Sequence, residues 1–345
     1  MTPYFSIIMP VYNVEAAFPA SLESVLAQDD RDFELILIDD GSTDGSGKLC
    51  DDCAAAHDFV RVIHKPNGGL ASARNAGIDN ARGQYIIMPD SDDLIEPNTL
   101  STVRGAIQAA ARQSALPVDM VRYDLQRHEG QHTSVYRTDV PEGLYAEGRV
   151  AELLDLALLD TFRFPLSACT HAYRRDFLNE QKLRFVSERE VFSEDFLFLL
   201  CAYMTAGSVY VTNKALYHYI SREGSLTNAP RKDALRRYTR LYEHLLAFAS
   251  EHGADDLLNQ KISTFYVCHL VYGYCIVLEY QVYPGHSWED GRRNVRNMLK
   301  DPAVRRASSN MYSRALKPKH RLRVLCIRMG WEAPLAFTQR GRRNG

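Results

Sequence analysis

Two clusters of carboxylates have residue types and spacing that could carry out chemistry. Asp90, Asp92 and Asp93 fall within four residues, directly after an apolar run. Farther along the chain, Glu194 and Asp195 are neighbours. Like charges this close raise one another's pKa unless a cation neutralises them. Mn²⁺ and Mg²⁺ prefer carboxylate oxygens and leave coordination positions open for phosphate groups. The first cluster could therefore hold a divalent metal ion.

Both clusters also have a purely structural interpretation. Asp93 precedes the segment LIEPNTL, so the first cluster could be a solvated acidic turn or the N-cap of a helix. Glu194 and Asp195 precede FLFLL, and the helix dipole favours acids in a first turn. An EF-hand is excluded because Leu94 and Ile95 occupy its ligand and glycine positions.

The first ninety residues contain the elements that must position these carboxylates. Apolar runs predict strands, and the segments between them carry apolar residues at helical spacing. The predicted strands span residues 5–12, 33–39, 59–65 and 83–90, and the predicted helices span residues 17–28, 46–57 and 72–81. This alternation indicates right-handed crossovers and a mostly parallel sheet. Further strands are expected near residues 120–123 and 208–211, and helices dominate from about residue 230.

Polar clusters follow three of the predicted strands, at residues 12–13, 39–42 and 90–93. In parallel sheets ligands bind at the carboxyl ends of strands, so we expect these clusters to face one crevice. The stretch LIDDGSTDGSGK is not a Walker loop, because Ser42 stands where its first glycine is needed and Leu49 follows the lysine. A dinucleotide oxidoreductase is not indicated either, since PVYNVE replaces the glycine-rich turn after the first strand.

Composition is that of a globular protein without polyelectrolyte character. The chain has 345 residues, 46% hydrophobic and 24% charged, with a formal net charge of −2. This balance does not favour a nucleic-acid partner. Seven scattered cysteines, an odd number, favour a reducing compartment with free thiols. The pair Cys50 and Cys53 has no second pair at zinc-site spacing, and we expect it on a helix.

The sequence predicts a cytoplasmic protein with one segment that could contact a membrane. The N-terminus has no basic start followed by an apolar signal core. Residues 262–278 are apolar but are interrupted by His269 and are short of a span of about 20 residues. We expect a buried amphipathic helix there.

The C-terminal tail, residues 314–345, carries nine Lys or Arg and one acid, Glu332. Apolar residues are interleaved with these charges: Leu322, Val324, Leu325, Ile327, Met329 and Trp331. This pattern suits peripheral contact with anionic lipids at the inner face of the plasma membrane. A solvated helix packed against its own domain is the alternative.

Five motifs occur in a characteristic order: PVYNVE, FELILIDDGSTDGS, NGGLASARNAG, GQYIIMPDSDD and SEDFLF. Over residues 4–225 the chain resembles the family 2 glycosyltransferases, inverting enzymes of the GT-A fold that use nucleotide-sugar donors. The resemblance implies an α/β fold, with a Rossmann-like, mostly parallel sheet flanked by helices and a C-terminal helical extension. The expected domains are residues 1–228, with a nucleotide-binding half at 1–104 and an acceptor half at 105–228, and a helical region at 229–345.

The resemblance also implies roles for individual residues. Nucleotide-sugar binding is implied for Pro10, Val11, Tyr12, Asn13, Asp39, Gly41, Ser42, Asn67, Gly69, Arg74, Asp90 and Ser91. Asp39 would accept the N3–H of uracil, although a carboxylate also accepts the N1–H of guanine. Arg74 would reach the base or the diphosphate, or else form a surface salt bridge. Asp90 would contact the ribose directly or through water.

For the metal and the catalytic groups the resemblance implies a further set. Asp92 would bind Mn²⁺ or Mg²⁺, which offsets charge on the departing nucleoside diphosphate. His218 would be a further metal ligand, unless it only packs. Asp195 would be the general base, with Glu194 orienting the acceptor or the base. Arg222 and Ser225 could contact the diphosphate.

The expected function is metal-dependent inverting transfer of a sugar, from a UDP-sugar foremost, to a hydroxyl of a glycan or lipid-linked glycan. Surface polysaccharide or lipopolysaccharide assembly is the expected context. The alternative is a non-catalytic nucleotide-sugar-binding scaffold of a glycan assembly complex. Such a scaffold would be expected to have a broken site, yet every acid of the implied site is present.

Overall fold

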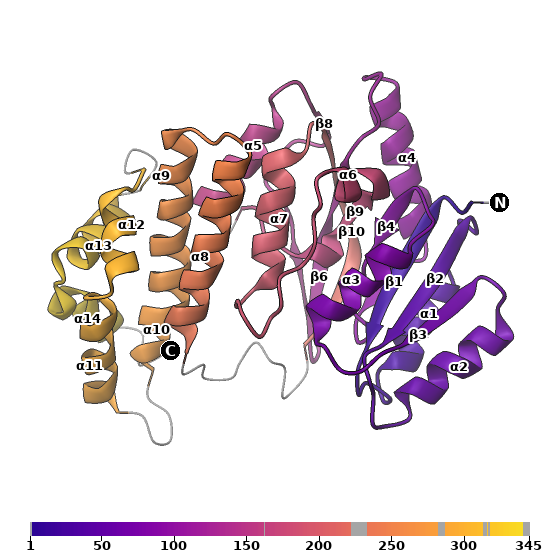
Figure 1. Cartoon of the computed structure of the whole chain (residues 1–345), viewed down its shortest axis with the longest axis horizontal. Helices are drawn as coiled ribbons and strands as arrows, with labels where there is room; N and C mark the ends of the chain where they lie inside the picture. The colour runs from indigo at the N-terminus through magenta and orange to yellow at the C-terminus, as the bar shows by residue number, and fades with distance from the viewer. Residues whose placement is uncertain are drawn as a thin grey trace. The chain divides into compact units, whose positions relative to one another are not determined.

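The computed structural model describes residues 2–161, 163–221, 233–281, 287–312, 316 and 318–340. The chain divides into two compact units (Figure 1). The first unit comprises Met1–Arg189 and Ser193–Thr227, and the second comprises Glu190–Phe192 and Asn228–Gly345. The separate roles expected for residues 1–104 and 105–228 stay a prediction.

The first unit contains a mixed sheet, and ten strands of it lie within the described residues. They are β1 (Phe5–Val11), β2 (Phe33–Asp39), β3 (Val60–His64), β4 (Tyr85–Ile87), β5 (Leu94–Ile95), β6 (Met120–Glu129), β7 (His132–Tyr136), β8 (Gly143–Tyr145), β9 (His171–Arg174) and β10 (Val209–Ile220). The main path runs β3-β2-β1-β4-β9-β6-β10-β5, while β7 pairs with β6 and β8 with β10.

Parallel pairing joins β3, β2, β1 and β4, and again β6 and β10. The strand β9 lies between these two groups and runs antiparallel to both β4 and β6. The mostly parallel α/β sheet expected from the sequence is therefore present. The short strands β5, β7, β8 and β9 were not predicted. The last three lie in residues 105–225, where the periodicity is weaker, and β5 is only two residues long.

Helices flank this sheet. In the first unit they are α1 (Phe18–Leu26), α2 (Ser46–Ala56), α3 (Leu70–Asn80), α4 (Thr99–Ala111), α5 (Val150–Leu159), α6 (Arg175–Glu180) and α7 (Glu194–Thr205). A 3₁₀ turn, Ala168–Thr170, precedes β9. The predicted helices of the first ninety residues match α1, α2 and α3 to within two residues at each end.

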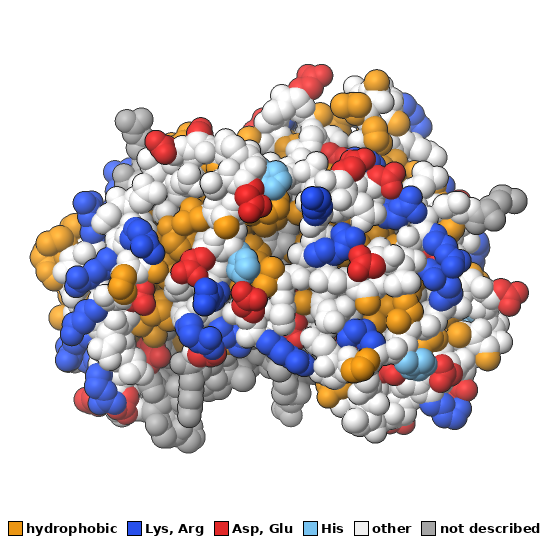
Figure 2. All heavy atoms as spheres, in the orientation of Figure 1, with side chains coloured by type: hydrophobic (Ala, Val, Ile, Leu, Met, Phe, Trp, Pro, Cys, Tyr) orange, Lys and Arg blue, Asp and Glu red, His pale blue; other side chains and the backbone are white. Residues whose placement is uncertain are grey.

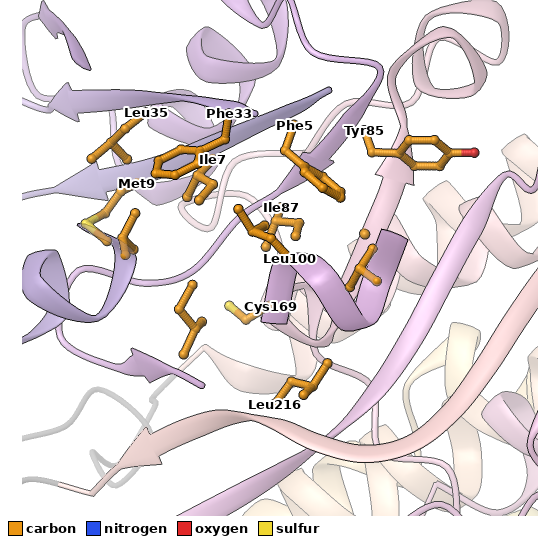
Figure 3. Packing of buried hydrophobic residues seen from close by; sticks show 14 of the residues in the cluster. Phe5, Ile7, Met9, Phe33, Leu35, Tyr85, Ile87, Leu100, Cys169 and Leu216 are labelled. Carbon is orange, nitrogen blue, oxygen red and sulfur yellow. The ribbon is translucent and has the colours of Figure 1, made fainter. Parts of the chain in front are cut away.

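The core lies on both faces of the central strands, which is why these strands read as continuous apolar runs. All seven residues of β1 are buried. Alternate residues such as Ile7 and Met9 join a cluster with Leu35 and Leu100 (Figure 3). On α3, a Cβ added at Gly77 would lie 2.1 Å from a methyl carbon of Ile8, so a glycine is needed for this close approach.

The seven cysteines are free, and six of them are buried. Cys50 and Cys53 lie on α2, as the sequence predicts, with both side chains in the core. Burial raises the pKa of the Cys50 thiol to about 12. These two cysteines act as small apolar residues of the core.

The second unit is helical in the part that the structure describes. Its helices are α8 (Ala234–Glu251), α9 (Asp256–Phe265), a π-helical stretch (Tyr266–Ile276), α10 (Val277–Glu279), α11 (Trp288–Met298), α12 (Pro302–Ser309), α13 (Pro318–Met329) and α14 (Glu332–Arg340). The helical region expected from about residue 230 begins with α8, which buries Tyr238, Leu241 and Leu245.

One continuous helical segment of the described chain, Asp256–Glu279, is long and apolar enough to cross a membrane. However, 61% of its most apolar window is buried inside the protein. A core helix passes the same test of length and composition, so that test is weak support for a membrane span. The burial agrees with the expected buried helix at residues 262–278.

Candidate active site

Three strand ends bring the polar clusters to one edge of the sheet. The strands β2, β1 and β4 are neighbours and run parallel, so the loops that follow them emerge on the same side (Figure 1). These loops carry Tyr12 and Asn13 after β1, Asp39 to Ser42 after β2, and Asp90 to Asp93 after β4. The expectation that they share one edge is thus met by the strand order.

The loop after β1 presents Tyr12 and Asn13 rather than the residues before them. Pro10 and Val11 are buried inside β1, so only their backbone groups could face a nucleoside. Tyr12 is 48% exposed, and Asn13 has a positive φ of 50°. The side-chain oxygen of Asn13 accepts the backbone N–H of Thr43 at 2.8 Å, which ties this loop to the one after β2.

Asp39 is held as a carboxylate at the end of β2. Its Oδ1 accepts the backbone N–H of Ser42 at 3.0 Å, and its Oδ2 lies 2.8 Å from Nδ1 of His64. Burial raises the pKa of Asp39, but the hydrogen bonds from Ser42 and His64 outweigh it and hold this pKa below the usual value. The turn between Asp39 and Ser42 contains Gly41, whose φ is +75°. An ionised Asp39 is suited to accept a nucleobase N–H.

Asp40 organises the loop that leads into α3. Its carboxylate accepts the backbone N–H groups of Gly68 at 3.0 Å and Gly69 at 2.7 Å. Its carbonyl accepts the side-chain amide of Asn67 at 3.1 Å. Gly69 has a φ of +90°, and a Cβ there would lie 1.7 Å from an oxygen of Glu188. Asn67 and Gly69 are therefore positioned by Asp40, and a side chain at Gly69 would be strained by this φ and would displace the Glu188 carboxylate.

Arg74 lies at the centre of the acidic groups. Its side chain is 1% exposed, and its guanidinium lies 2.6 Å from Asp195, 2.8 Å from Asp90 and 3.5 Å from Glu194. It also lies over the ring of Phe185, 5.1 Å from the centroid. Burial lowers the pKa of Arg74, but the carboxylates outweigh it and raise this pKa. The alternative of a surface salt bridge is wrong, because α3 turns this side chain inward.

Asp93 differs from the other acids of its loop because it is buried. Its carboxylate accepts the hydroxyl of Tyr217 at 2.5 Å and the backbone N–H of Ile220 at 2.8 Å. Burial, together with the charge of Asp90, raises the pKa of Asp93 to about 7. The alternative of a helix N-cap at Asp93 is wrong, since α4 begins only at Thr99. Asp93 anchors β10 to the acidic loop.

Asp92 is half-buried at the sheet edge, and Ser91 beside it is buried. Among the described residues, no group of three or more His, Cys, Asp or Glu side chains is gathered to hold a metal ion. His218 pairs in register with Leu94, close to this loop, but Glu96 and His128 each lie 2.9 Å from one of its ring nitrogens. The role of His218 as a metal ligand stays a prediction.

The second acidic cluster begins α7. Ser193 at its N-cap has a φ of 58°, a left-handed conformation that is uncommon for a residue with a side chain. Asp195 accepts the backbone N–H of Ala168 at 3.1 Å with the oxygen that does not face Arg74. Burial and the charge of Asp195 raise the pKa of Glu194 to about 7, although Arg74 lowers it. The acids start a helix, as one interpretation expects, and both lie near Arg74; their catalytic roles stay a prediction.

Sequence reasoning missed three contributors to this site. His64 ends β3 in register with Asp39, and its place at the end of a predicted strand was the signal. Asp40 directly follows Asp39, the residue for which the resemblance implied nucleobase binding. Cys169 lies 3.4 Å from Asp90 and 3.5 Å from Arg74, and no local pattern indicated it. The predicted diphosphate contacts Arg222 and Ser225 lie outside the described residues.

Comparison of the sequence with known proteins identifies the family of this chain. A family model described as "Glycosyl transferase family 2" matches residues 6–180. The uncharacterized glycosyltransferase EpsJ of Bacillus subtilis is 31% identical over 100% of this chain and 98% of its own length. The chain belongs to glycosyltransferase family 2. The succinoglycan biosynthesis protein ExoO of Rhizobium meliloti is 30% identical, over 74% of this chain and 70% of its own length.

Solved structures show the same fold for this family 2 glycosyltransferase. S. aureus TarS 1–349 in complex with UDP superposes with a TM-score of 0.69 at 20% identity, covering 99% of this chain and 91% of that one. The mannosyltransferase PcManGT from Pyrobaculum calidifontis, in complex with GDP-Man and Mn²⁺, gives a TM-score of 0.52 at 16% identity, with coverages of 97% and 87%. The GT-A fold expected from the sequence is therefore present.

Proposed function

We propose that this family 2 glycosyltransferase moves a sugar from a nucleotide donor, UDP-sugars foremost, to a hydroxyl of a glycan or lipid-linked glycan, with inversion. The observation that carries the proposal is the buried Arg74. Its guanidinium lies within 3 Å of both Asp90, in the acidic loop after β4, and Asp195, at the start of α7. One side chain thereby holds the predicted donor-binding loop beside the predicted base.

Asp195 is suited to act as general base. Its two oxygens each accept one hydrogen bond, from Arg74 and from the N–H of Ala168, so each keeps a lone pair for a hydroxyl proton. Its side chain is 21% exposed, which leaves room for an acceptor to approach. In a single displacement the acceptor hydroxyl attacks while Asp195 takes its proton, and the configuration at the sugar carbon inverts.

Asp39 supports nucleotide binding without choosing the nucleotide. Its carboxylate is ionised, and both uracil and guanine present an N–H that it could accept. Among the similar structures, TarS is described in complex with UDP-GlcNAc and PcManGT in complex with GDP-Man. We expect a UDP-sugar before a GDP-sugar as donor, because TarS superposes on this chain with a higher TM-score than PcManGT does.

The acidic loop fits a divalent cation of the kind that nucleotide sugars carry. Mg²⁺ and similar hard cations are often held by one or two carboxylates together with substrate phosphates. Asp92 supplies such a carboxylate at the sheet edge, and His218 is the further candidate. When bound, Mn²⁺ or Mg²⁺ would act as a Lewis acid toward the leaving diphosphate.

The acceptor is proposed to be a hydroxyl of a surface polysaccharide or lipopolysaccharide precursor. The relatives ExoO and EpsJ support this context, since ExoO is named for succinoglycan biosynthesis. A lipid-linked acceptor would place the enzyme in the cytoplasm at the inner face of the plasma membrane.

The proposal is tested with Asp195→Asn, measuring donor binding and turnover separately. A panel of nucleotide sugars with Mn²⁺ is first screened by thermal shift, because a ligand that binds only the native state stabilises it. With the donor so found, Asp195→Asn should keep the shift while donor hydrolysis and transfer fall by about 10²–10⁴-fold. EDTA should abolish both turnover reactions.

The matched control is Asp176→Asn, since Asp176 is a surface acid paired with Arg175. It should change neither the thermal shift nor turnover. Turnover of Asp195→Asn at the wild-type rate would remove Asp195 from the role of base. Full activity in EDTA would remove the metal from the proposal.

A further inference from the structure

The second unit exposes a row of large apolar side chains on and just after α13. Leu322, Leu325 and Met329 are 59%, 46% and 52% exposed, and Trp331 is 51% exposed. We call these four residues the α13 face. The spacings of three and four residues place the first three on one side of the helix. Of twelve large hydrophobic side chains exposed in the described chain, four fall within these ten residues.

The rest of α13, from Cys326 at the border of this face to Ile327 on the far side, is fixed in the unit. Cys326 and Ile327 are 2% and 1% exposed, and Arg323 lies over the ring of Tyr272, 4.7 Å from its centroid. The backbone N–H of Trp331 donates to the carbonyl of Cys326 at 2.8 Å. The helix therefore packs against its domain, as one alternative expects, and still exposes an apolar face; contact with lipid stays a prediction. Ile327, expected among the lipid-facing residues, is instead buried in the unit.

The surroundings of the α13 face are basic. Arg321 and Arg328 on α13 are exposed, and Arg305 and Arg306 on the adjacent α12 are exposed as well. Glu332 is 5% exposed and is neutralised by Arg292 at 2.8 Å and Arg296 at 3.5 Å. Figure 2 shows Lys and Arg side chains over the helices α11 to α14 of the second unit.

We propose that the α13 face docks onto a membrane surface that contains anionic lipids. The apolar side chains would enter the boundary between head groups and acyl chains, while the arginines meet the lipid phosphates. Trp331 suits this depth, where tryptophan is enriched. The inference rests on charge complementarity and exposure alone, and it holds whether or not the proposed donor chemistry does.

A second copy of the chain fits this surface less well than a lipid bilayer. A twofold dimer brings a patch against its own copy, because the same residues form both sides of the interface. Arg321 and Arg328 would then face the same arginines of the other copy across an apolar contact. Anionic lipid provides the opposite charge instead.

The test is co-sedimentation of the full chain with vesicles of phosphatidylcholine, with and without phosphatidylglycerol. Wild-type protein should bind the anionic vesicles and lose binding as salt rises. Leu325→Glu, which places a charge in the centre of the α13 face, should lower the partition coefficient at least about tenfold. Leu116→Glu is the matched control, since Leu116 is a 73% exposed leucine of the first unit.

Three outcomes would overturn the proposal. These are equal binding of Leu325→Glu and wild type, equal binding to neutral and anionic vesicles, and a dimer that Leu325→Glu dissociates while vesicles bind neither form. Donor-induced thermal shift should be the same in both variants, which verifies folding and keeps this result separate from the test of the transferase activity. A point substitution is used instead of a truncation of the tail, because removing α13 would expose the core that Cys326 and Ile327 help to cover.

Discussion

Replacing Arg74 with methionine should destabilise the first unit because it removes the one buried cation that joins three carboxylates in the site. Arg74 is 1% exposed and lies 2.6 Å from Asp195 and 2.8 Å from Asp90. Methionine keeps the length of the side chain but not its charge. The carboxylates are then left beside one another in a partly buried site, where like charges repel.

The expected loss follows from the burial of the partners. Breaking a buried ion pair by removing one side costs about 3–5 kcal/mol, because the other charge is left without compensation. Asp90 and Asp195 are 30% and 21% exposed, so water compensates part of their charge. The free energy of unfolding of Arg74→Met should therefore fall by about 3 kcal/mol near neutral pH, the lower end of that range.

The pH dependence of this loss separates charge from packing. Without Arg74, which lowers the pKa of Glu194, the Glu194 carboxyl should titrate at a higher pH in the folded state. Groups whose folded pKa is raised favour the folded state more as pH falls, so the deficit should shrink between pH 7.5 and pH 5. A deficit caused only by poorer packing would not depend on pH.

The assay is urea denaturation of wild type and variant at both pH values. The control is Arg149→Met, because Arg149 forms an exposed pair with Glu152 that contributes at most about 1 kcal/mol. A deficit below about 1 kcal/mol for Arg74→Met, or one that is equal at both pH values, would refute the electrostatic role assigned to Arg74.

Two other substitutions follow from the same site. The pKa of Glu194 is raised from 4.5 to about 7 in the folded state, so this group favours folding below pH 4.5 and loses that contribution as pH rises through 7. Glu194→Gln should therefore flatten the fall in stability between these pH values, as measured by urea denaturation in EDTA; an unchanged slope would contradict the assignment. Gly69→Ala should lower the free energy of unfolding by about 1–3 kcal/mol and weaken donor binding, because φ is +90° and Glu188 blocks the Cβ. Its control, Gly105→Ala in the open on α4, should raise stability by about 0.4–1 kcal/mol.

The spacing of apolar residues and the polar residues at strand ends predicted most of the fold of the first ninety residues. The runs that became β1 and β2 are mostly apolar at positions facing either side of the sheet, because both faces of those strands are covered. The polar residues that interrupt them mark where each strand ends, and the parallel order then places these ends at one edge. For β4 the predicted strand was longer than the observed Tyr85–Ile87, because the apolar run continues past the last paired residue.

The sequence alone predicted most acids of the candidate site, but it missed Asp40 and did not show which acids are buried or paired. Asp92 and Asp93 are adjacent in the sequence, yet Asp93 turns inward to Tyr217, which lies 124 residues away along the chain. A surface salt bridge was one alternative for Arg74, which instead meets Asp195 across 121 residues in a buried pair. Patterns of neighbouring residues report local conformation, whereas such contacts depend on how distant helices and strands pack.

The same division applies to the tail. Its basic charge and apolar residues were evident from the sequence, and they predicted contact with lipid. Only the folded unit decided that Ile327 is covered while Leu325 and Trp331 remain exposed, because that depends on which side of α13 packs against the other helices. The composition of the tail determined that it is basic and partly apolar. Tertiary packing determined which of its side chains are exposed and could contact a lipid surface.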